Sequence, residues 1–129
     1  MGFPSPAQDY TEKRLSLDSL CDTFRPSVYL IRAESYSRRE GIRSHAMLVV
    51  NRSLKPAHGS IIVVRLYGEF HLRRVRLWPE PRLESLDNPA CFEGLNPEGD
   101  LSDGEQTICF GVVTHVLNDL RVLAAHGGQ

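Results

Sequence analysis

Residues 58–77 read HGSIIVVRLYGEFHLRRVRL, and this stretch decides the fold. Two runs rich in β-branched and apolar residues, 61–66 and 69–77, flank the dipeptide Tyr67-Gly68. A two-residue connection between such runs is typical of a β-hairpin with a tight turn. The stretch therefore predicts an antiparallel hairpin near the middle of the chain.

Further strand-like runs lie on both sides of this hairpin, each short, apolar and partly β-branched or aromatic. They cover residues 28–33, 47–50, 82–86 and 107–117. In the last run Gly111 indicates a bulge or a close approach of two backbones.

The segments between these runs are of two kinds. Residues 15–24 (LSLDSLCDTF) predict one short helix that Ser16 or Asp18 can cap and that Pro26 ends. Residues 88–103 are rich in Gly, Pro and acidic residues and predict a surface loop. One helix followed by several antiparallel strands predicts a mainly β fold.

The length of 129 residues suits a single domain that can bury its own core. Residues 1–14 contain prolines and polar residues and predict an extended N-terminal arm. Residues 15–123 form the predicted β domain, and residues 124–129 a frayed tail.

The composition, with 41% hydrophobic and 24% charged residues, is ordinary for a soluble globular protein, and we expect the chain to lie in the cytoplasm. No run of 18 apolar residues and no signal peptide are present, so we expect no contact with a membrane. The three cysteines are far apart and the five histidines are scattered, without the spacing of a zinc site. We therefore expect free thiols, no metal and no cofactor.

Charge is divided unevenly along the chain. Residues 32–76 contain nine Arg, one Lys and three Glu, a net charge of +7, whereas residues 77–129 contain two Arg and nine acids, a net charge of −7. Such a division can steer an acidic partner or orient two protomers. Solvated strand faces explain the same pattern more simply, and no aromatic-basic motif specific to nucleic acid is present.

Three motifs in order carry a family resemblance: GFPSPAQDY at 2–10, the hairpin stretch at 58–77, and FGVVTHV at 110–116. Together they resemble the UmuD/LexA family of self-cleaving Ser/Lys peptidases. The likeness covers nearly the whole chain and implies the twisted antiparallel β fold of the LexA and UmuD C-terminal domains. The start resembles processed UmuD′, in which the Gly of this string directly follows the cut bond. Because Met1 precedes Gly2 here, we expect the chain to be made in processed form, without an arm to remove.

The resemblance also implies where a catalytic pair would lie, and both positions depart from the family pattern. The nucleophile normally lies in a Gly-Asp-Ser-Met turn, where this chain reads ESYSR at 34–38, so Ser37 is the best candidate and Ser35 the alternative. The position of the general-base lysine is Arg73. A guanidinium stays protonated and cannot act as that base. The only lysines, Lys13 and Lys55, are not at the position of the family base. We expect a degenerate, inactive dyad.

The resemblance implies a non-enzymatic subunit of an error-prone translesion polymerase, of the polymerase V type, in the bacterial SOS response to DNA damage. Its implied partners are a second copy of the chain, a UmuC-type polymerase, the RecA filament and the sliding clamp, with DNA touched only indirectly. The apolar run 108–117 is the expected dimer contact.

Two other functions fit the same sequence. One is a regulatory partner that pairs with a full-length UmuD or LexA relative, and the other is an active serine peptidase with an unrecognised base, which Arg73 opposes. A LexA-type repressor is disfavoured because no helix-turn-helix precedes the β domain.

Overall fold

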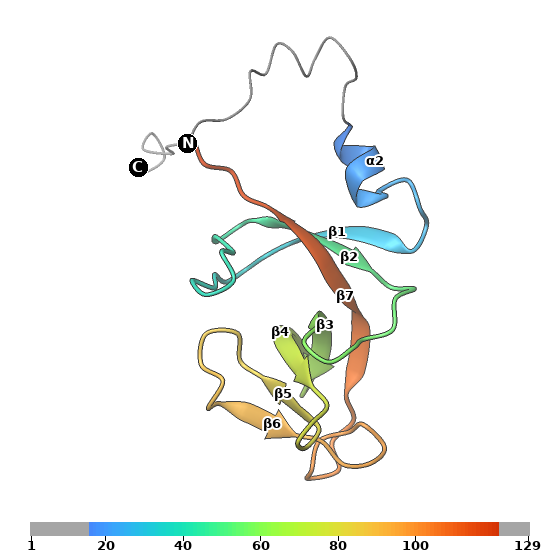
Figure 1. Ribbon diagram of the computed structural model, residues 1–129, viewed down its shortest axis with the longest axis vertical. Coiled ribbons are helices and arrows are strands. Elements are labelled where there is room, and N and C mark those ends of the chain that lie inside the picture. Colours follow the sequence, from blue (N-terminus) through green and yellow to red (C-terminus); the bar gives the residue numbers. More distant parts are fainter. Residues whose placement is uncertain (1–15, 122–129) are drawn as a thin grey trace.

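The computed structural model describes residues 16–121 of the chain. Seven strands form one antiparallel sheet in the order β1-β2-β7-β3-β4-β5-β6 (Figure 1). The expected mainly β architecture with one short helix is confirmed. The arm predicted over residues 1–14 and the tail predicted over residues 124–129 lie outside the described residues.

The elements agree with the predicted runs to within about two residues at most ends, which is the usual uncertainty of such boundaries. In chain order they are α2 (Leu17–Cys21), β1 (Val28–Arg32), β2 (Met47–Asn51), β3 (Ile61–Leu66), β4 (Glu69–Arg76), β5 (Arg82–Glu84), β6 (Phe92–Gly94) and β7 (Ile108–Leu117).

Helix α2 is shorter than the predicted segment 15–24. Ser16 is its N-cap, as expected, and its hydroxyl accepts a hydrogen bond from the amide N–H of Ser19 at 3.2 Å. None of its residues is buried, and Leu17 and Leu20 are both exposed. The helix therefore contributes little to the core.

The predicted hairpin is formed by β3 and β4. Tyr67 and Gly68 both have positive φ, 51° and 86°, as a type I′ turn requires. The ladder runs from Ile61↔Arg74 to Leu66↔Glu69 without a break. The turn thereby fixes the register that sends Arg73 and Arg74 to opposite faces of β4.

Both faces of β3 are buried, and the core accordingly consists of two clusters. Val63 packs on one face with Val50 and Leu48 of β2. Ile62, Val64 and Leu66 pack on the other face, with a second group of apolar side chains from β4, β5 and β7. A strand covered on both sides reads as a continuous apolar run, which explains the sequence IIVV at the start of β3.

Strand β7 is the link between the two parts of the sheet. It pairs with β2 on one side and β3 on the other (Figure 1). Its register shifts twice, between Val49 and Val50 of β2 and between Val63 and Val64 of β3. Each shift leaves one extra residue on β7, and such bulges increase the local twist of a sheet.

Gly111 lies where β7 passes closest to the backbone of β2 and the residue that follows it. A Cβ atom at this position would stand 2.8 Å from Val50 Cγ1 and 3.1 Å from the carbonyl oxygen of Asn51. The predicted close approach is confirmed, and it lies on a strand that pairs with both β2 and β3.

The surface loop predicted over residues 88–103 was wrong in part, because it contains β6. The amide of Cys91 donates to the carbonyl of Asn88, and the amide of Ser85 donates to the carbonyl of Cys91. This turn folds the chain back so that Phe92–Gly94 pairs with β5. Three residues in a polar context show no periodicity, so the strand left no signal in the sequence.

One buried carboxylate holds the β4–β5 pair together. Arg76 and Arg82 lie directly opposite each other, an arrangement that repels. Glu84, whose side chain is 3% exposed, accepts hydrogen bonds at 3.0 Å from the Nε atoms of both arginines. Burial by itself would raise the pKa of Glu84, but the two arginine hydrogen bonds hold that pKa below its ordinary value.

Within residues 16–121, no helix has the length and apolar character needed to cross a membrane.

Substituting Gly111 with alanine is expected to destabilise the fold by about 1–3 kcal/mol, because the added methyl group overpacks the contact with Val50. Chemical denaturation of the two proteins measures this difference. The control is Cys109→Ala at an exposed site on the same strand, which we expect to change stability by less than about 0.5 kcal/mol. Equal midpoints for G111A and wild type would contradict the close-approach argument.

Glu84→Gln is expected to lower the melting temperature at pH 7, because Arg76 and Arg82 then face each other without a counter-charge. Because folding lowers the pKa of Glu84, its contribution to stability is present above about pH 4.5 and is lost as the pH falls through the depressed value. Melting curves followed by circular dichroism from pH 7 to pH 3 should therefore fall less steeply for E84Q than for wild type.

The control is Glu98→Gln, which removes one negative charge from an exposed loop residue and should leave the pH dependence of melting like that of wild type. Identical pH profiles for E84Q and wild type would show that Glu84 contributes nothing through its charge.

Candidate functional site

A cleft of about 820 Å³ is lined by both nucleophile candidates, Ser37 and Ser35, and by Arg73 at the position of the base. Ser35 and Ser37 come from the segment after β1, and Arg73 comes from β4. Phe70 and Phe110 add aromatic walls from β4 and β7. The fold thus brings together residues that are more than 30 positions apart in the sequence.

Ser37 closes a tight turn. Its amide donates to the carbonyl of Ile42 at 2.8 Å, and the amide of Ile42 donates back to the carbonyl of Ser37 at 2.9 Å. The residue is 4% exposed. Its hydroxyl donates to Asp87 Oδ1 at 2.7 Å and accepts from the amide of Glu40 at 3.3 Å. Ser35 also lines the cleft, but it is exposed.

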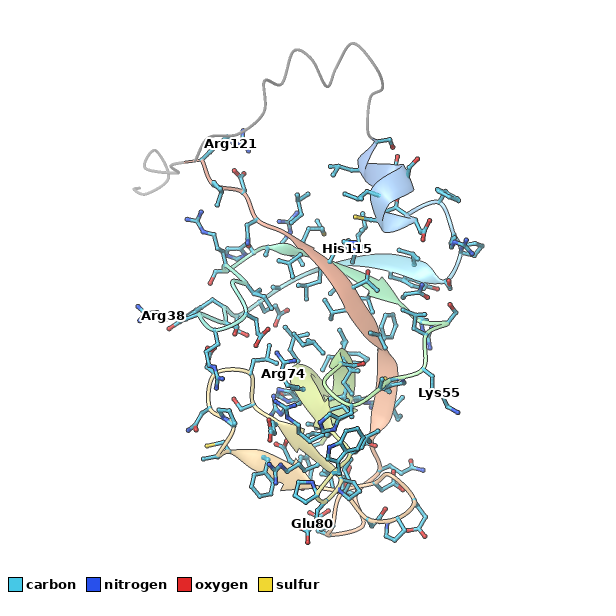
Figure 2. All side chains as sticks on the ribbon, viewed as in Figure 1. Arg38, Lys55, Arg74, Glu80, His115 and Arg121 are labelled. Atoms are coloured by element: carbon cyan, nitrogen blue, oxygen red, sulfur yellow. The ribbon has the colours of Figure 1, made fainter. Side chains whose placement is uncertain are left out.

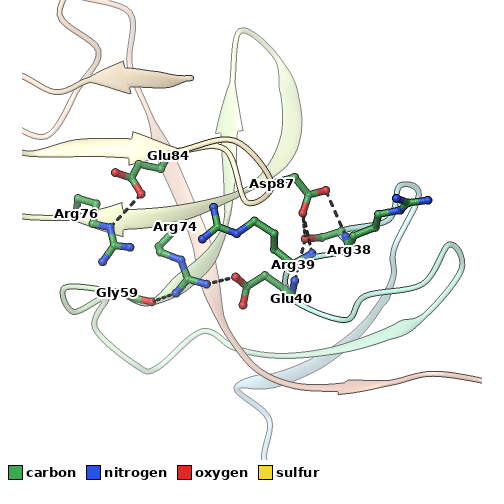
Figure 3. A network of polar contacts seen from close by, with 9 residues as sticks. Arg38, Arg39, Glu40, Gly59, Arg74, Arg76, Glu84 and Asp87 are labelled. Carbon is green, nitrogen blue, oxygen red and sulfur yellow. Dashed lines mark hydrogen bonds and ion pairs between the residues drawn. The ribbon is translucent and has the colours of Figure 1, made fainter. Parts of the chain in front are cut away.

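Asp87 follows β5 and reaches across to the Ser37 turn (Figure 3). Besides the Ser37 hydroxyl, it accepts the amide N–H of Arg39 at 3.0 Å and, more weakly, that of Arg38 at 3.4 Å. The Ser37 hydroxyl and the Arg39 amide hold the pKa of Asp87 below its ordinary value. The carboxylate is therefore ionised at neutral pH and is a weak base.

Arg73, which also lines the cleft, forms hydrogen bonds with Glu93 and with the backbone of β4. Its Nε and Nη2 atoms donate to the two carboxylate oxygens of Glu93 on β6 at 3.0 and 3.2 Å. Its Nη1 atom donates to the carbonyl of Leu72 at 2.9 Å. Among residues 16–121 no hydrogen bond joins Arg73 to Ser37. The two side chains share a cleft but not a contact.

The Ser37 turn is held from two further directions. Arg74 forms an ion pair with Glu40 and donates to the carbonyl of Gly59 at 2.7 Å (Figure 3). Asn118, which follows β7, donates to the carbonyl of Gly41 at 2.7 Å and accepts from the amide of Arg43 at 3.0 Å. The turn is thus tied to β4 and to the end of β7 as well as to Asp87.

Of the two lysines, only Lys55 lies within the described residues. Lys55 lies in the loop after β2, does not line the cleft, and lies on the opposite side of the view from Arg38 and the Ser37 turn (Figure 2). It is not placed to serve as a base for Ser37. Lys13 is outside the described residues.

Three of the nine arginines in the basic stretch 32–76 form ion pairs within the described residues, and Arg82 outside it forms another. Arg73 pairs with Glu93, Arg74 with Glu40, and both Arg76 and Arg82 with Glu84. The three arginines of β4 therefore each pair with an acid from a different segment of the chain.

No group of three or more His, Cys, Asp or Glu in the described part of the chain has the arrangement of a metal site. The three cysteines are free. Cys109 is an exposed residue, but partial desolvation of its sulfur raises the pKa of the thiol.

Sequence reasoning missed Asp87 and Glu93, the acids that engage Ser37 and Arg73. Asp87 is 50 positions from Ser37, and Glu93 is 20 positions from Arg73. Both lie in or beside the segment that was interpreted as a surface loop, where acids are ordinary. Only the unexpected strand β6 gives Glu93 its place beside Arg73.

Comparison with known proteins shows the family to which the chain belongs. The model of the Peptidase S24-like family matches residues 1–112. Protein ImpA of Escherichia coli is 40% identical over 124 residues, which cover 95% of this chain and 80% of ImpA. Protein MucA of Escherichia coli is 37% identical over 117 residues, covering 90% of this chain and 77% of MucA.

Protein SamA of Salmonella typhimurium is 35% identical over 121 residues, covering 93% of this chain and 80% of SamA. The family match spans the Ser37 turn, the β3–β4 hairpin and the first half of β7. The chain belongs to the Peptidase S24-like family, the family of the self-cleaving proteins LexA and UmuD.

Proposed function

We propose that the chain is a UmuD′-like accessory subunit of an error-prone translesion polymerase in the SOS response, and that it has no peptidase activity. Its membership of the Peptidase S24-like family and its likeness to ImpA, MucA and SamA support the general role. The contact between Arg73 and Glu93 is the observation that carries the loss of peptidase activity.

The chemistry of the family needs a neutral base to take the proton of the serine hydroxyl. A guanidinium stays protonated and cannot take this proton. Arg73 instead donates two hydrogen bonds to the carboxylate of Glu93. The absence of a general base typically lowers a rate by about 10²–10⁴, so Arg73 alone accounts for an inactive site.

The partners that we propose are a second copy of the chain and a UmuC-type polymerase, with the RecA filament and the sliding clamp as further contacts. Both edges of β7 are already paired, with β2 and β3. A dimer contact through β7 must therefore use its side chains, and Ile108 and Leu117 are exposed on it. Such a complex would form in the bacterial cytoplasm and would touch DNA only through the polymerase.

Co-expression with the UmuC-type polymerase of the same host tests the role. We expect a complex that elutes as one species in size-exclusion chromatography, with two copies of this chain per polymerase. We also expect primer extension past an abasic site by that complex and not by the polymerase alone. The control is the polymerase co-expressed with an unrelated small β protein.

A homodimer that elutes apart from the polymerase, and that adds nothing to lesion bypass, would contradict the proposed subunit role. The same chain recovered instead with a full-length UmuD or LexA relative would favour a regulatory dimerisation partner.

The proposed inactivity predicts that a fluorophosphonate probe does not label Ser37 in the wild-type chain. Intact-mass and peptide mass spectrometry after incubation at neutral pH measure this, with an active serine hydrolase labelled in parallel. Rapid labelling of Ser37, abolished by Ser37→Ala, would show that a working base exists and would refute the inactivity.

A further inference from the structure

We propose that Asp87 is a positioning residue that holds the Ser37 turn in a non-reactive arrangement, as a second block on peptidase chemistry that acts independently of Arg73. The inference rests on the proposed loss of peptidase activity and extends it. It predicts that restoring a base at position 73 is not sufficient to make Ser37 a nucleophile.

Asp87 contacts three consecutive residues of the turn, one through its side-chain hydroxyl and two through their backbone amides. It accepts the hydroxyl of Ser37 at 2.7 Å and the amides of Arg39 and Arg38 at 3.0 and 3.4 Å (Figure 3). The Ser37 hydroxyl in turn accepts the amide of Glu40. One carboxylate thus fixes both the nucleophile candidate and the backbone that carries it, in the manner of an Asx-type cap made from a distant residue.

This arrangement is unsuited to nucleophilic attack. An attacking serine must give its proton to a base within hydrogen-bond reach. Here the hydroxyl proton is directed to a carboxylate whose pKa lies below its ordinary value, so proton transfer to it is unfavourable at neutral pH. Although Ser37 lines the cleft, it is only 4% exposed, so little of its surface is accessible to an incoming carbonyl.

The block is separate from the Arg73–Glu93 pair. Asp87 lies in the segment after β5, and Glu93 lies on β6. Within the described chain, no hydrogen bond connects Asp87 or Ser37 to Arg73 or Glu93. A substitution at position 73 therefore leaves the three contacts of Asp87 in place.

The test begins by introducing a lysine as a general base at position 73. Arg73→Lys alone would place an amine beside Glu93, whose negative charge favours the protonated form. The double variant R73K/E93Q removes that carboxylate, and labelling at pH 9 raises the neutral fraction of the amine. In the labelling step, a bond forms between Ser37 Oγ and phosphorus as the P–F bond breaks. Fluoride leaves, and the hydroxyl proton passes to the neutral amine of the introduced lysine.

Three chains are then compared with the same fluorophosphonate probe: R73K/E93Q, R73K/E93Q/D87A and R73K/E93Q/D103A. Asp103 is the matched control, because it also accepts a hydroxyl, that of Tyr67 at 2.7 Å, and a nearby amide, that of Glu105 at 2.9 Å. We expect D87A to raise the rate of Ser37 labelling at least tenfold over R73K/E93Q. We expect D103A to leave the rate unchanged, and a further Ser37→Ala change to abolish labelling.

The outcomes separate the two proposals. Labelling of the wild-type chain would refute the proposed inactivity. Equal labelling of R73K/E93Q with and without D87A would refute the second block but leave the proposed function intact. A folded D87A triple variant that stays unlabelled would refute the second block as well.

A second measurement uses only single substitutions and does not depend on the rebuilt base. Asp87→Ala in the wild-type background should speed hydrogen exchange at the amides of Arg39 and Glu40 at least tenfold. Asp103→Ala should leave these two amides unchanged. Unchanged exchange in a folded D87A protein would show that Asp87 does not hold the turn, and would overturn the proposal.

Discussion

The close approach of β7 to β2 at Gly111 is the constraint on which the rest of the sheet depends. Strand β7 alone pairs with both β2 and β3, so it joins the pair β1–β2 to the remaining strands. It does so with two bulges and with a glycine at the tightest point. The resulting twist lets the chain bury both faces of β3 within a single sheet. It also directs Phe110 into the cleft that holds Ser37 and Arg73.

Ion pairs between arginines of β4 and acids from other segments surround the cleft that contains Ser37 and Arg73. Arginines occupy the strand that faces the serine turn, and each finds a carboxylate from another segment. Glu40 ties the turn to β4, Glu93 ties β6 to β4, and Glu84 ties β5 to β4. Pairs of this kind, partly or fully buried, give a unique arrangement more than they give net stability. These ion pairs therefore connect β4 to the Ser37 turn, to β5 and to β6.

The parts of this fold that depend on local sequence were predictable. The Tyr67-Gly68 turn, the Ser16 cap and the close approach at Gly111 follow from residue types that admit few alternatives. Strand β6 was not predictable, because three residues show no periodicity and their pairing depends on the turn at Asn88. Likeness to a family placed Ser37 and Arg73 together, but nothing in the sequence pointed to Asp87 or Glu93. The contacts that Asp87 and Glu93 make depend on the completed fold, and the spacing of these residues in the sequence does not predict them.

The position of β7 in the chain has a consequence for how the protein is made. Residues 108–117 form a central strand of the sheet, yet they follow every other strand in the sequence. During synthesis β2 and β3 leave the ribosome before β7. The edges of β2 and β3 that pair with β7 in the folded sheet therefore stay unpaired until β7 has been made. Exposed edges of this kind are prone to pair with other chains, and strand pairs of high sequence separation form slowly. The nascent chain thus passes through a stage in which its two halves are unjoined and open to mispairing or to capture by a chaperone.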